Sequence, residues 1–308
     1  IDKNKSIGGG ASGNLIAFQL PKLTLDESSY GIFSLRSFLY SRSLVNQLKA
    51  SPATDGVVVF PSKEREIIKF QKLIEMGWRK SLLNRYSGEY IDSFKTGLHF
   101  PYAGIVDNKK FLKRLSTNIK LINEFNIINV KEFNSEKTLI ADCGKTIKAK
   151  SIVWANGFEM KDILKNELII PVSGQVTYLK ENDITKKMNL NFSFGKFFSQ
   201  SYLGWHQTGS TFSRENFKAS YLNDKNNINQ LPKFIRDKFE FSSIENFDSR
   251  FSIRASTKDR LPFLGSVQEN NEFFIGGMGS WGFIYAPFLA EILIRNILYE
   301  PIFLEDFV

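Results

Sequence analysis

Cysteine and histidine are scarce in this 308-residue chain, which has one cysteine, Cys143, and two histidines, His99 and His206. A single cysteine excludes an internal disulfide bond and fits a reducing compartment, so we expect a cytoplasmic protein. Two histidines argue against a histidine-rich metal site and against a serine–histidine hydrolase. We therefore expect no bound metal ion.

Long apolar runs, internal repeats and low-complexity tracts are also missing, and we expect no signal peptide. A membrane span needs about eighteen or more consecutive apolar residues, so we expect no membrane association. With 42% hydrophobic and 24% charged residues, the composition is that of a folded soluble protein. The net charge of +9 suits a polyanionic partner such as RNA. Because the lysines are scattered, a generally lysine-rich composition explains this charge equally well.

Helical and extended patterns alternate along the chain, with no long linker to separate two domains. Apolar spacing predicts helices over 31–49, 63–76, 109–119, 225–239 and 282–298. Short β-rich runs predict strands over 55–60, 120–125, 127–133, 137–142, 146–149, 150–157, 168–179, 249–257 and 272–277, with a hairpin over 197–212 around Gly204. We also expect the end of a strand near Asp2. The mixture predicts an α/β or α+β fold in which any second domain is interleaved with the first.

Three turns rich in glycine and other small residues stand out. The first is IGGGASGN (7–14), and Asp2 precedes it, where a dinucleotide-binding βαβ unit places the carboxylate that accepts from a ribose hydroxyl. The second ends the stretch KSIVWANG (150–157), and the third, IGGMGSWGF (275–283), leads directly into a helix. Bare backbone at a helix N-terminus accommodates a flat or anionic group. Each turn alone is typical of a surface loop, but three together indicate a cofactor across the carboxyl ends of a sheet.

The stretch SIRASTKDRLPFLG (252–265) carries Arg254 on a strand, between the apolar residues Ile253 and Ala255. Most arginines take part in surface ion pairs. The apolar neighbours leave open a partly buried arginine, which requires an anionic partner.

Seven motifs follow one another in a fixed order, from GASGN (10–14) through LHFPYAG (98–104), IVWANG (152–157), IPVSGQV (170–176), TGSTF (208–212) and the Arg254 stretch to GGMGSWGFIYAPFLAEIL (276–293). In this order they resemble the D-amino-acid-oxidase-like (DAO) FAD-dependent oxidoreductases. Within that family they are most similar to the oxidase domain of the bifunctional proteins that modify carboxymethylaminomethyl-thiouridine in tRNA. The resemblance extends over nearly the whole chain.

The resemblance implies that FAD contacts five segments of this sequence. Asp2 matches the acid that binds the adenosine ribose, and Val130 lies on the strand that contacts the adenine side through its backbone. The remaining expected contacts are Gly10, Ala11, Ser12, Gly13 and Asn14 in the first turn, Ala155, Asn156 and Gly157 in the second, and Gly277, Gly279, Ser280, Trp281, Gly282 and Phe283 in the third. The helix that begins in the third turn would stabilise negative charge on the reduced flavin.

Two features depart from the family pattern. The GxGxxG fingerprint that should precede Asp2 is absent from the sequence, so we expect an N-terminally truncated chain without its first βα unit. Trp281 stands where we expect arginine in the tRNA-modifying group.

The resemblance also implies a domain division. We expect a Rossmann-like FAD/NAD(P)-binding domain interleaved with an antiparallel-sheet substrate domain. Residues 1–50, 100–165 and 250–308 would form the FAD-binding domain, and residues 51–99 and 166–249 the substrate-binding domain.

The implied activity is that of an FAD-dependent oxidoreductase acting on a CH–NH group. It would remove the carboxymethyl group, as glyoxylate, from 5-carboxymethylaminomethyl-(2-thio)uridine at the tRNA wobble position and leave the aminomethyl form. Arg254 matches the arginine that holds the substrate carboxylate, and Tyr102, Gln175 and His206 are candidates for lining the pocket. A fused or separate SAM-dependent methyltransferase is an expected partner. Two alternatives remain, an FAD-dependent oxidase of a free amino acid such as glycine or sarcosine, and a flavin-free RNA-binding remnant.

Overall fold

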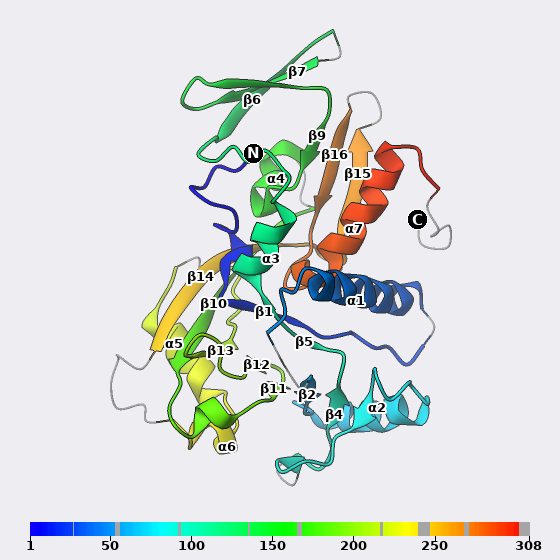
Figure 1. The fold of residues 1–308 in the computed structure, drawn as a ribbon, viewed down its shortest axis with the longest axis vertical. Helices are drawn as coiled ribbons and strands as arrows, with labels where there is room; N and C mark the ends of the chain where they lie inside the picture. The colour runs from blue at the N-terminus through cyan, green and yellow to red at the C-terminus, as the bar shows by residue number, and fades with distance from the viewer. Residues whose placement is uncertain are drawn as a thin grey trace.

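The computed structural model describes residues 1–26, 28–52, 56–91, 94–134, 136–164, 168–215, 218–239, 247–267 and 271–301. The expected mixed α/β fold is confirmed, with strands and helices interleaved along the chain (Figure 1). The helices are α1 (Ser29–Gln47), α2 (Glu64–Glu75), α3 (Asn108–Leu115), α4 (Met160–Leu164), α5 (Tyr221–Asn229), α6 (Lys233–Arg236) and α7 (Gly282–Ile297), with short 3₁₀ turns η1 (Ala11–Gly13), η3 (Gly157–Glu159) and η4 (Thr185–Lys187).

The largest sheet has eight strands in the order β14-β10-β13-β12-β11-β2-β4-β3. Its strands are β14 (Phe247–Ser256), β10 (Ile170–Lys180), β13 (Trp205–Gly209), β12 (Phe197–Phe198), β11 (Asn191–Ser193), β2 (Val57–Val59), β4 (Leu98–Phe100) and β3 (Asn84–Arg85). Every neighbouring pair is antiparallel except β11 and β2. The pair at one edge of the sheet, β10 with β14, runs in register from Ile170 opposite Ser256 to Leu179 opposite Phe247.

Three smaller sheets complete the fold. One pairs β1 (Ile16–Gln19) with β5 (Gly104–Asp107), and a hairpin sheet contains β6 (Ile127–Phe133), β7 (Glu136–Ala141) and β8 (Thr146–Ala149). The third has the order β15 (Phe263–Val267), β16 (Glu272–Gly276) and β9 (Ile152–Trp154). Its strands β16 and β9 run parallel, so their carboxyl ends meet at one edge of the sheet. The second and third small-residue turns begin at that edge.

Side-chain caps fix where three helices begin. The hydroxyl of Ser28 accepts from the Gly31 amide before α1, the Asp107 carboxylate accepts from the Lys110 amide before α3, and Ser220 caps α5 in the same way. Each cap satisfies one of the helix's first amides, which have no carbonyl within the helix to bond. The predicted helices 31–49, 63–76, 109–119 and 282–298 are confirmed as α1, α2, α3 and α7 within a few residues.

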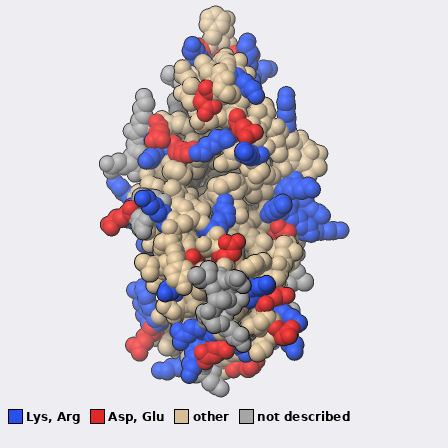
Figure 2. All heavy atoms as spheres, turned by 90° about the vertical axis from the view of Figure 1, so that its left-hand side faces the viewer, with Lys and Arg blue, Asp and Glu red and all other residues tan. Residues whose placement is uncertain are grey.

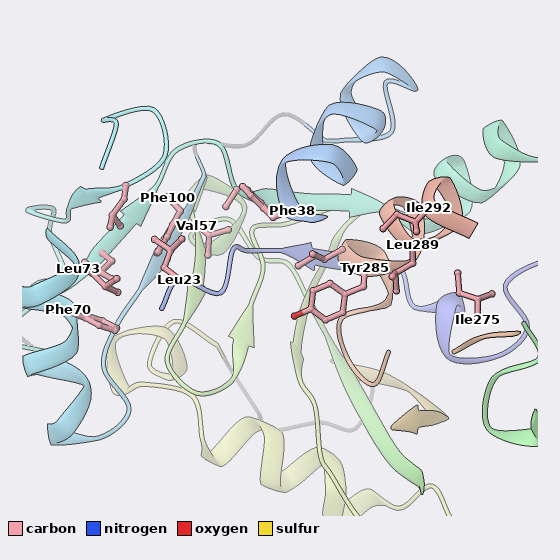
Figure 3. Close-up of a cluster of buried hydrophobic side chains, with 14 of the residues drawn as sticks. Leu23, Phe38, Val57, Phe70, Leu73, Phe100, Ile275, Tyr285, Leu289 and Ile292 are labelled. Atoms are coloured by element: carbon pink, nitrogen blue, oxygen red, sulfur yellow. The ribbon is translucent and has the colours of Figure 1, made fainter. Parts of the chain in front are cut away.

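The main hydrophobic core joins parts of the chain that are far apart in sequence. Figure 3 shows Phe38 of α1 and Tyr285 and Leu289 of α7 in one cluster with Val57 of β2 and Phe70 of α2. In a second cluster, side chains of β10, β11, β12 and β2 pack against α5 and α6. Residues 51–99, which the sequence assigns to the substrate domain, contribute to both clusters. The domain division stays a proposal. Strand β14 contains residues from both sides of the proposed boundary at residue 250, and it pairs with β10 along its whole length.

Three local expectations were wrong. Residues 1–10 contain no strand, because after a pairing of Asp2 with Ile122 and Phe125 the chain turns at Asn4, whose amide donates to the Asp2 carboxylate. The predicted strand 120–125 is also absent. The predicted helix 225–239 is two helices, since α5 ends before Pro232, which has no amide hydrogen to continue the helical bonding. Among the described residues, no helix is both long and apolar enough to span a membrane, and no cluster of metal-ligating side chains occurs.

Candidate functional site

All three small-residue turns lie along strand β14. The Arg250 side chain of β14 donates to the carbonyls of Gly9 and Gly10 at 3.0 and 2.8 Å. The amide of Gly279, in the third turn, donates to the carbonyl of Ala255 at 2.7 Å. The second turn continues into η3, which packs against the same strand. Segments that are more than a hundred residues apart in sequence therefore surround one strand.

Several glycines of these turns face open space. A methyl group added at Gly10, Gly157 or Gly282 would meet no other heavy atom within 4 Å, and one at Gly279 would meet only Ser256, at 3.5 Å or more. Gly9, Gly13 and Gly277 are crowded, because an added carbon would lie 2.5 Å from Asn4, 2.2 Å from the Gly8 carbonyl oxygen and 2.7 Å from Thr257, respectively. The chain therefore presents bare backbone to space that a ligand can occupy.

The start of α7 is held in place by two side chains from other elements. Pro287 lies in the first turns of α7 and has no amide hydrogen to donate to the Phe283 carbonyl four residues earlier. Gln19 of β1 and Ser41 of α1 donate to that carbonyl instead, at 2.7 and 2.6 Å. The first amides of α7, which have no partner within the helix, are thereby fixed in direction. They form a preorganised site for negative charge.

Arg254 is buried without a carboxylate partner. Its side chain, 8% exposed, lies over Gly174 of β10 and donates to the Ser210 hydroxyl at 2.6 Å. Its guanidinium carbon is 4.6 Å from the centre of the Phe212 ring. No acidic side chain of the described chain lies within ion-pair distance, and burial lowers the pKa of Arg254 to about 10. A buried guanidinium without a carboxylate partner is suited to bind an anionic group of a ligand.

Gln175 and His206 lie on the opposite face of the large sheet from Arg254. Because side chains alternate along a strand and register partners share a face, Arg254 lies on the face of Val172 and Gly174, away from Gln175. Gln175 donates to the Asp224 carboxylate of α5 at 2.6 Å.

His206, which is fully buried, stacks on Phe198 and bonds through Nδ1 to the Ser199 carbonyl oxygen. Burial lowers the pKa of His206. His206 pairs with Leu179 of β10 and so lies on the same face as Gln175, away from Arg254.

The other predicted residues fall in three places. Tyr102 is 36% exposed, and its ring packs edge-on against Phe38 of α1. Val130 is half-buried on β6 of the hairpin sheet. Asp2 bonds to Asn4 through the backbone amide and the side-chain amide, both at 2.8 Å. The structure thus brings the glycine turns and Arg254 together around β14, and places Tyr102, Val130 and Asp2 on other elements.

The third turn contains Trp281, where the resemblance leads us to expect arginine. Its indole stacks on Tyr285 with ring centres 6.0 Å apart, and the ammonium of Lys22 lies 6.0 Å from the indole. A cation is therefore present beside this position, although it comes from a different segment.

The family model of the FAD dependent oxidoreductases (DAO) matches residues 1–295. The chain belongs to the DAO family of FAD-dependent oxidoreductases. Among curated proteins it is similar to the tRNA 5-methylaminomethyl-2-thiouridine biosynthesis bifunctional protein MnmC of Leptospira interrogans, with 25% identity over 96% of this chain and 53% of that protein. MnmC of Marinobacter nauticus is 26% identical over 67% of this chain and 35% of its own length. The chain spans about half the length of the first of these relatives and a third of the second.

Solved structures show the same fold. Glycine oxidase from Geobacillus kaustophilus matches with a TM-score of 0.79 and 16% identity over 100% of this chain and 90% of that one. Iminodiacetate oxidase from Chelativorans sp. BNC1 matches with a TM-score of 0.77 and 16% identity over 100% and 91%. At these identities the likeness establishes the DAO fold alone.

As a DAO-family oxidoreductase the protein uses FAD, and its residues fit that cofactor. The open glycines at positions 10, 157 and 282 leave room for a large planar group. The N-terminus of α7 stabilises negative charge on a cofactor bound there. The individual contacts predicted from the sequence, from Asp2 to Phe283, stay predictions.

Sequence reasoning missed two cations near this site. Arg250 lies four residues before Arg254, and strand alternation places both on the same face of β14. That spacing was visible in the sequence. Lys196, in the turn between β11 and β12, bonds to the Ser210 carbonyl and lies 5.8 Å from the Phe212 ring centre. No local pattern identifies Lys196, because only tertiary folding brings it to Arg254.

Proposed function

We propose that this protein oxidises the carboxymethylaminomethyl group of a tRNA wobble uridine and leaves the aminomethyl form. The secondary amine loses a hydride from the CH₂ beside its carboxylate and the proton of its N–H, and water then hydrolyses the resulting imine to the primary amine and glyoxylate. FAD, when bound, accepts that hydride. Similarity to the MnmC proteins supports a tRNA substrate, and the reducing compartment expected from a single cysteine is the cytoplasm.

The observation that carries this proposal is the unpaired, buried guanidinium of Arg254. A carboxylate arm fits it as a partner, because guanidinium and carboxylate form two parallel hydrogen bonds. Such a pair fixes the orientation of the carboxylate as well as binding it. The adjacent CH₂ would therefore be held in a defined direction for hydride transfer. Ser210 and the carbonyl of Ser173 hold the guanidinium in place.

A second candidate is an oxidase of a free amino acid such as glycine or sarcosine. The fold match to glycine oxidase favours it, and Arg254 would bind the carboxylate in the same way. Membership of the DAO family argues against the flavin-free RNA-binding alternative. A SAM-dependent methyltransferase, fused or separate, remains part of the proposal because the relatives are named bifunctional and the chain spans only part of them.

Mixing the flavin-loaded protein with substrate in the absence of oxygen tests the proposal. tRNA carrying the carboxymethylaminomethyl group should bleach the flavin in one turnover and release one glyoxylate per flavin. Unmodified tRNA is the matched control and should leave the flavin oxidised. Bleaching by sarcosine or glycine but not by the modified tRNA would overturn the proposal in favour of the free amino acid oxidase.

A further inference from the structure

A polar cavity of about 360 Å³ lies beside Phe212, the ring that Arg254 contacts, and is larger than a carboxylate requires. It is lined by Lys196, by loop residues 211–213, and by three amide side chains of α5 and its C-cap, Asn223, Asn226 and Gln230. Ser173 lines the cavity and also accepts from Arg254 through its carbonyl. The cavity and the Arg254 site therefore meet at Phe212, which lines the cavity and carries the Arg254 guanidinium over its ring.

Two cations meet beside Phe212. Arg254 donates to the Ser210 hydroxyl, and Lys196 bonds to the carbonyl of the same residue. Both lie near the ring of Phe212, which is 61% exposed. Burial and the charge of Arg254 lower the pKa of Lys196. An ammonium has three donors, so Lys196 keeps donors for an oxygen atom inside the cavity.

The amides on the other side of the cavity are available to a ligand. Asn226 and Gln230 are exposed, and their side chains make no hydrogen bond to the described part of the chain. Asn223 donates to Gln175 at 3.3 Å, which leaves its carbonyl oxygen for other partners. Primary amides offer donors and an acceptor side by side. They match a group that itself alternates carbonyl, N–H and carbonyl, which is the imide edge of uracil.

We propose that this cavity is the subsite for the uracil nucleotide that carries the oxidised arm. The inference rests on the proposed function and extends it to base recognition. With the arm's carboxylate on Arg254, Lys196 contacts the uracil oxygen next to the arm, and the α5 amides read the imide edge. A free amino acid would leave the cavity to water. Its volume lies within the range of small-molecule sites.

Titration of the flavin-loaded protein with uridine monophosphate tests the subsite without any turnover. The double variant Asn226→Ala/Gln230→Ala should weaken uridine monophosphate binding at least about tenfold, since two hydrogen-bonding groups are lost. Cytidine monophosphate, whose base lacks the imide edge, should bind the wild type more weakly. Asn229→Ala is the matched control, because Asn229 is an exposed amide of α5 outside the cavity. It should leave the affinity unchanged.

Equal uridine monophosphate affinity in the double variant and the wild type would overturn the subsite, as would equal binding of the two nucleotides. Flavin reduction by modified tRNA separates this failure from that of the proposed function. If the modified tRNA bleaches the wild-type flavin and the double variant keeps the wild-type KM, the function stands and the subsite falls. If the double variant raises KM with little change in the limiting rate, both are supported. Without any bleaching of the wild-type flavin, the function falls.

Discussion

The two faces of the sheet formed by β14 and β10 both carry polar side chains, but these side chains have different partners. On one face, Arg250 and Arg254 have no carboxylate within ion-pair distance among the described residues. On the other face, Gln175 and Thr177 both donate to the buried carboxylate of Asp224, at 2.6 and 2.7 Å. We call the face of Gln175 and Thr177 the closed face, because α5 supplies the carboxylate that both side chains bond. The face of Arg250 and Arg254 is the open face, because it leaves positive charge for a ligand.

This difference separates binding from stability. Removing a group from the closed face leaves buried partners unsatisfied, which lowers the free energy of unfolding. A group removed from the open face leaves few partners behind, so the loss appears in ligand binding and turnover. Figure 2 shows Lys and Arg mixed with Asp and Glu over the side of the molecule that it draws.

The largest effect is expected at Gly282, on the open side. Gly282→Asp places a negative charge at the first position of α7, in the space assigned to the flavin. The holoprotein should then copurify with little or no flavin, as measured by absorbance after denaturation. An acidic residue at a helix N-terminus stabilises the helix by about 0.3–1 kcal/mol, so the fold should survive.

Gly265→Asp is the control for that experiment. Gly265 lies on β15, has open space around an added carbon, and is outside the three turns. Its variant should keep the flavin. Full flavin content in Gly282→Asp would remove the third turn from the cofactor site.

Arg254→Ala should have the next largest effect. Truncating one partner of a desolvated charge pair removes about 2–5 kcal/mol of transition-state binding. We expect slow single-turnover flavin reduction by modified tRNA, with flavin content unchanged. Affinity for whole tRNA at fixed salt should fall far less, because phosphate contacts supply most of that affinity. A wild-type rate of flavin reduction would show that Arg254 is structural.

Arg254→Lys sharpens the same comparison. It keeps the positive charge but loses the planar fork that pairs with both carboxylate oxygens. The variant should retain flavin and lose much of the turnover, between the wild type and Arg254→Ala. If lysine restores the full rate, charge alone suffices and the orienting role of the fork is excluded.

On the closed face the expected change is in stability. Asp224 is 3% exposed and accepts from both Gln175 and Thr177. Asp224→Ala should lower the free energy of unfolding by about 3 kcal/mol, because two buried donors lose their partner. Chemical denaturation measures this loss. The limiting rate of flavin reduction per bound flavin should stay unchanged, and a parallel fall in that rate would show that the two faces are coupled.

The sequence predicts the open face better than the closed one, for a physical reason. Arg254 and the glycine turns belong to local motifs, so their patterns are visible in a single chain. Gln175 and His206 have the right chemistry for a pocket, but their role depends on which face α5 covers. Alternation along a strand shows which residues share a face of the sheet. It does not show which of the two faces a helix will cover. Lys196 reaches the site only through tertiary folding, and the strand expected before Asp2 failed because no ladder of partners is present there.

The smallest expected effect concerns His206 and pH. His206 lies between Phe198 and Phe239 on the closed face, and burial lowers its pKa below the ordinary value. Well above pH 7 the imidazole is neutral in both the folded and the unfolded chain and contributes nothing to the pH dependence. As the pH falls below the unfolded value of about 6.5, the unfolded chain takes up a proton that the folded chain does not. Stability should therefore decrease toward acid, by at most about 1.4 kcal/mol per pH unit from this one proton.

His206→Phe keeps an aromatic ring in the stack and removes the titrating group. Free energies of unfolding measured between pH 7 and pH 5 should fall less steeply in this variant than in the wild type. The variant also loses the bond to the Ser199 carbonyl, which lowers its stability at every pH without changing the slope. If His206 instead titrated freely at a solvated, catalytic position, its ordinary pKa would give the two proteins the same slope. Identical slopes would thus return His206 to the list of pocket residues, and a reduced slope keeps it on the closed face.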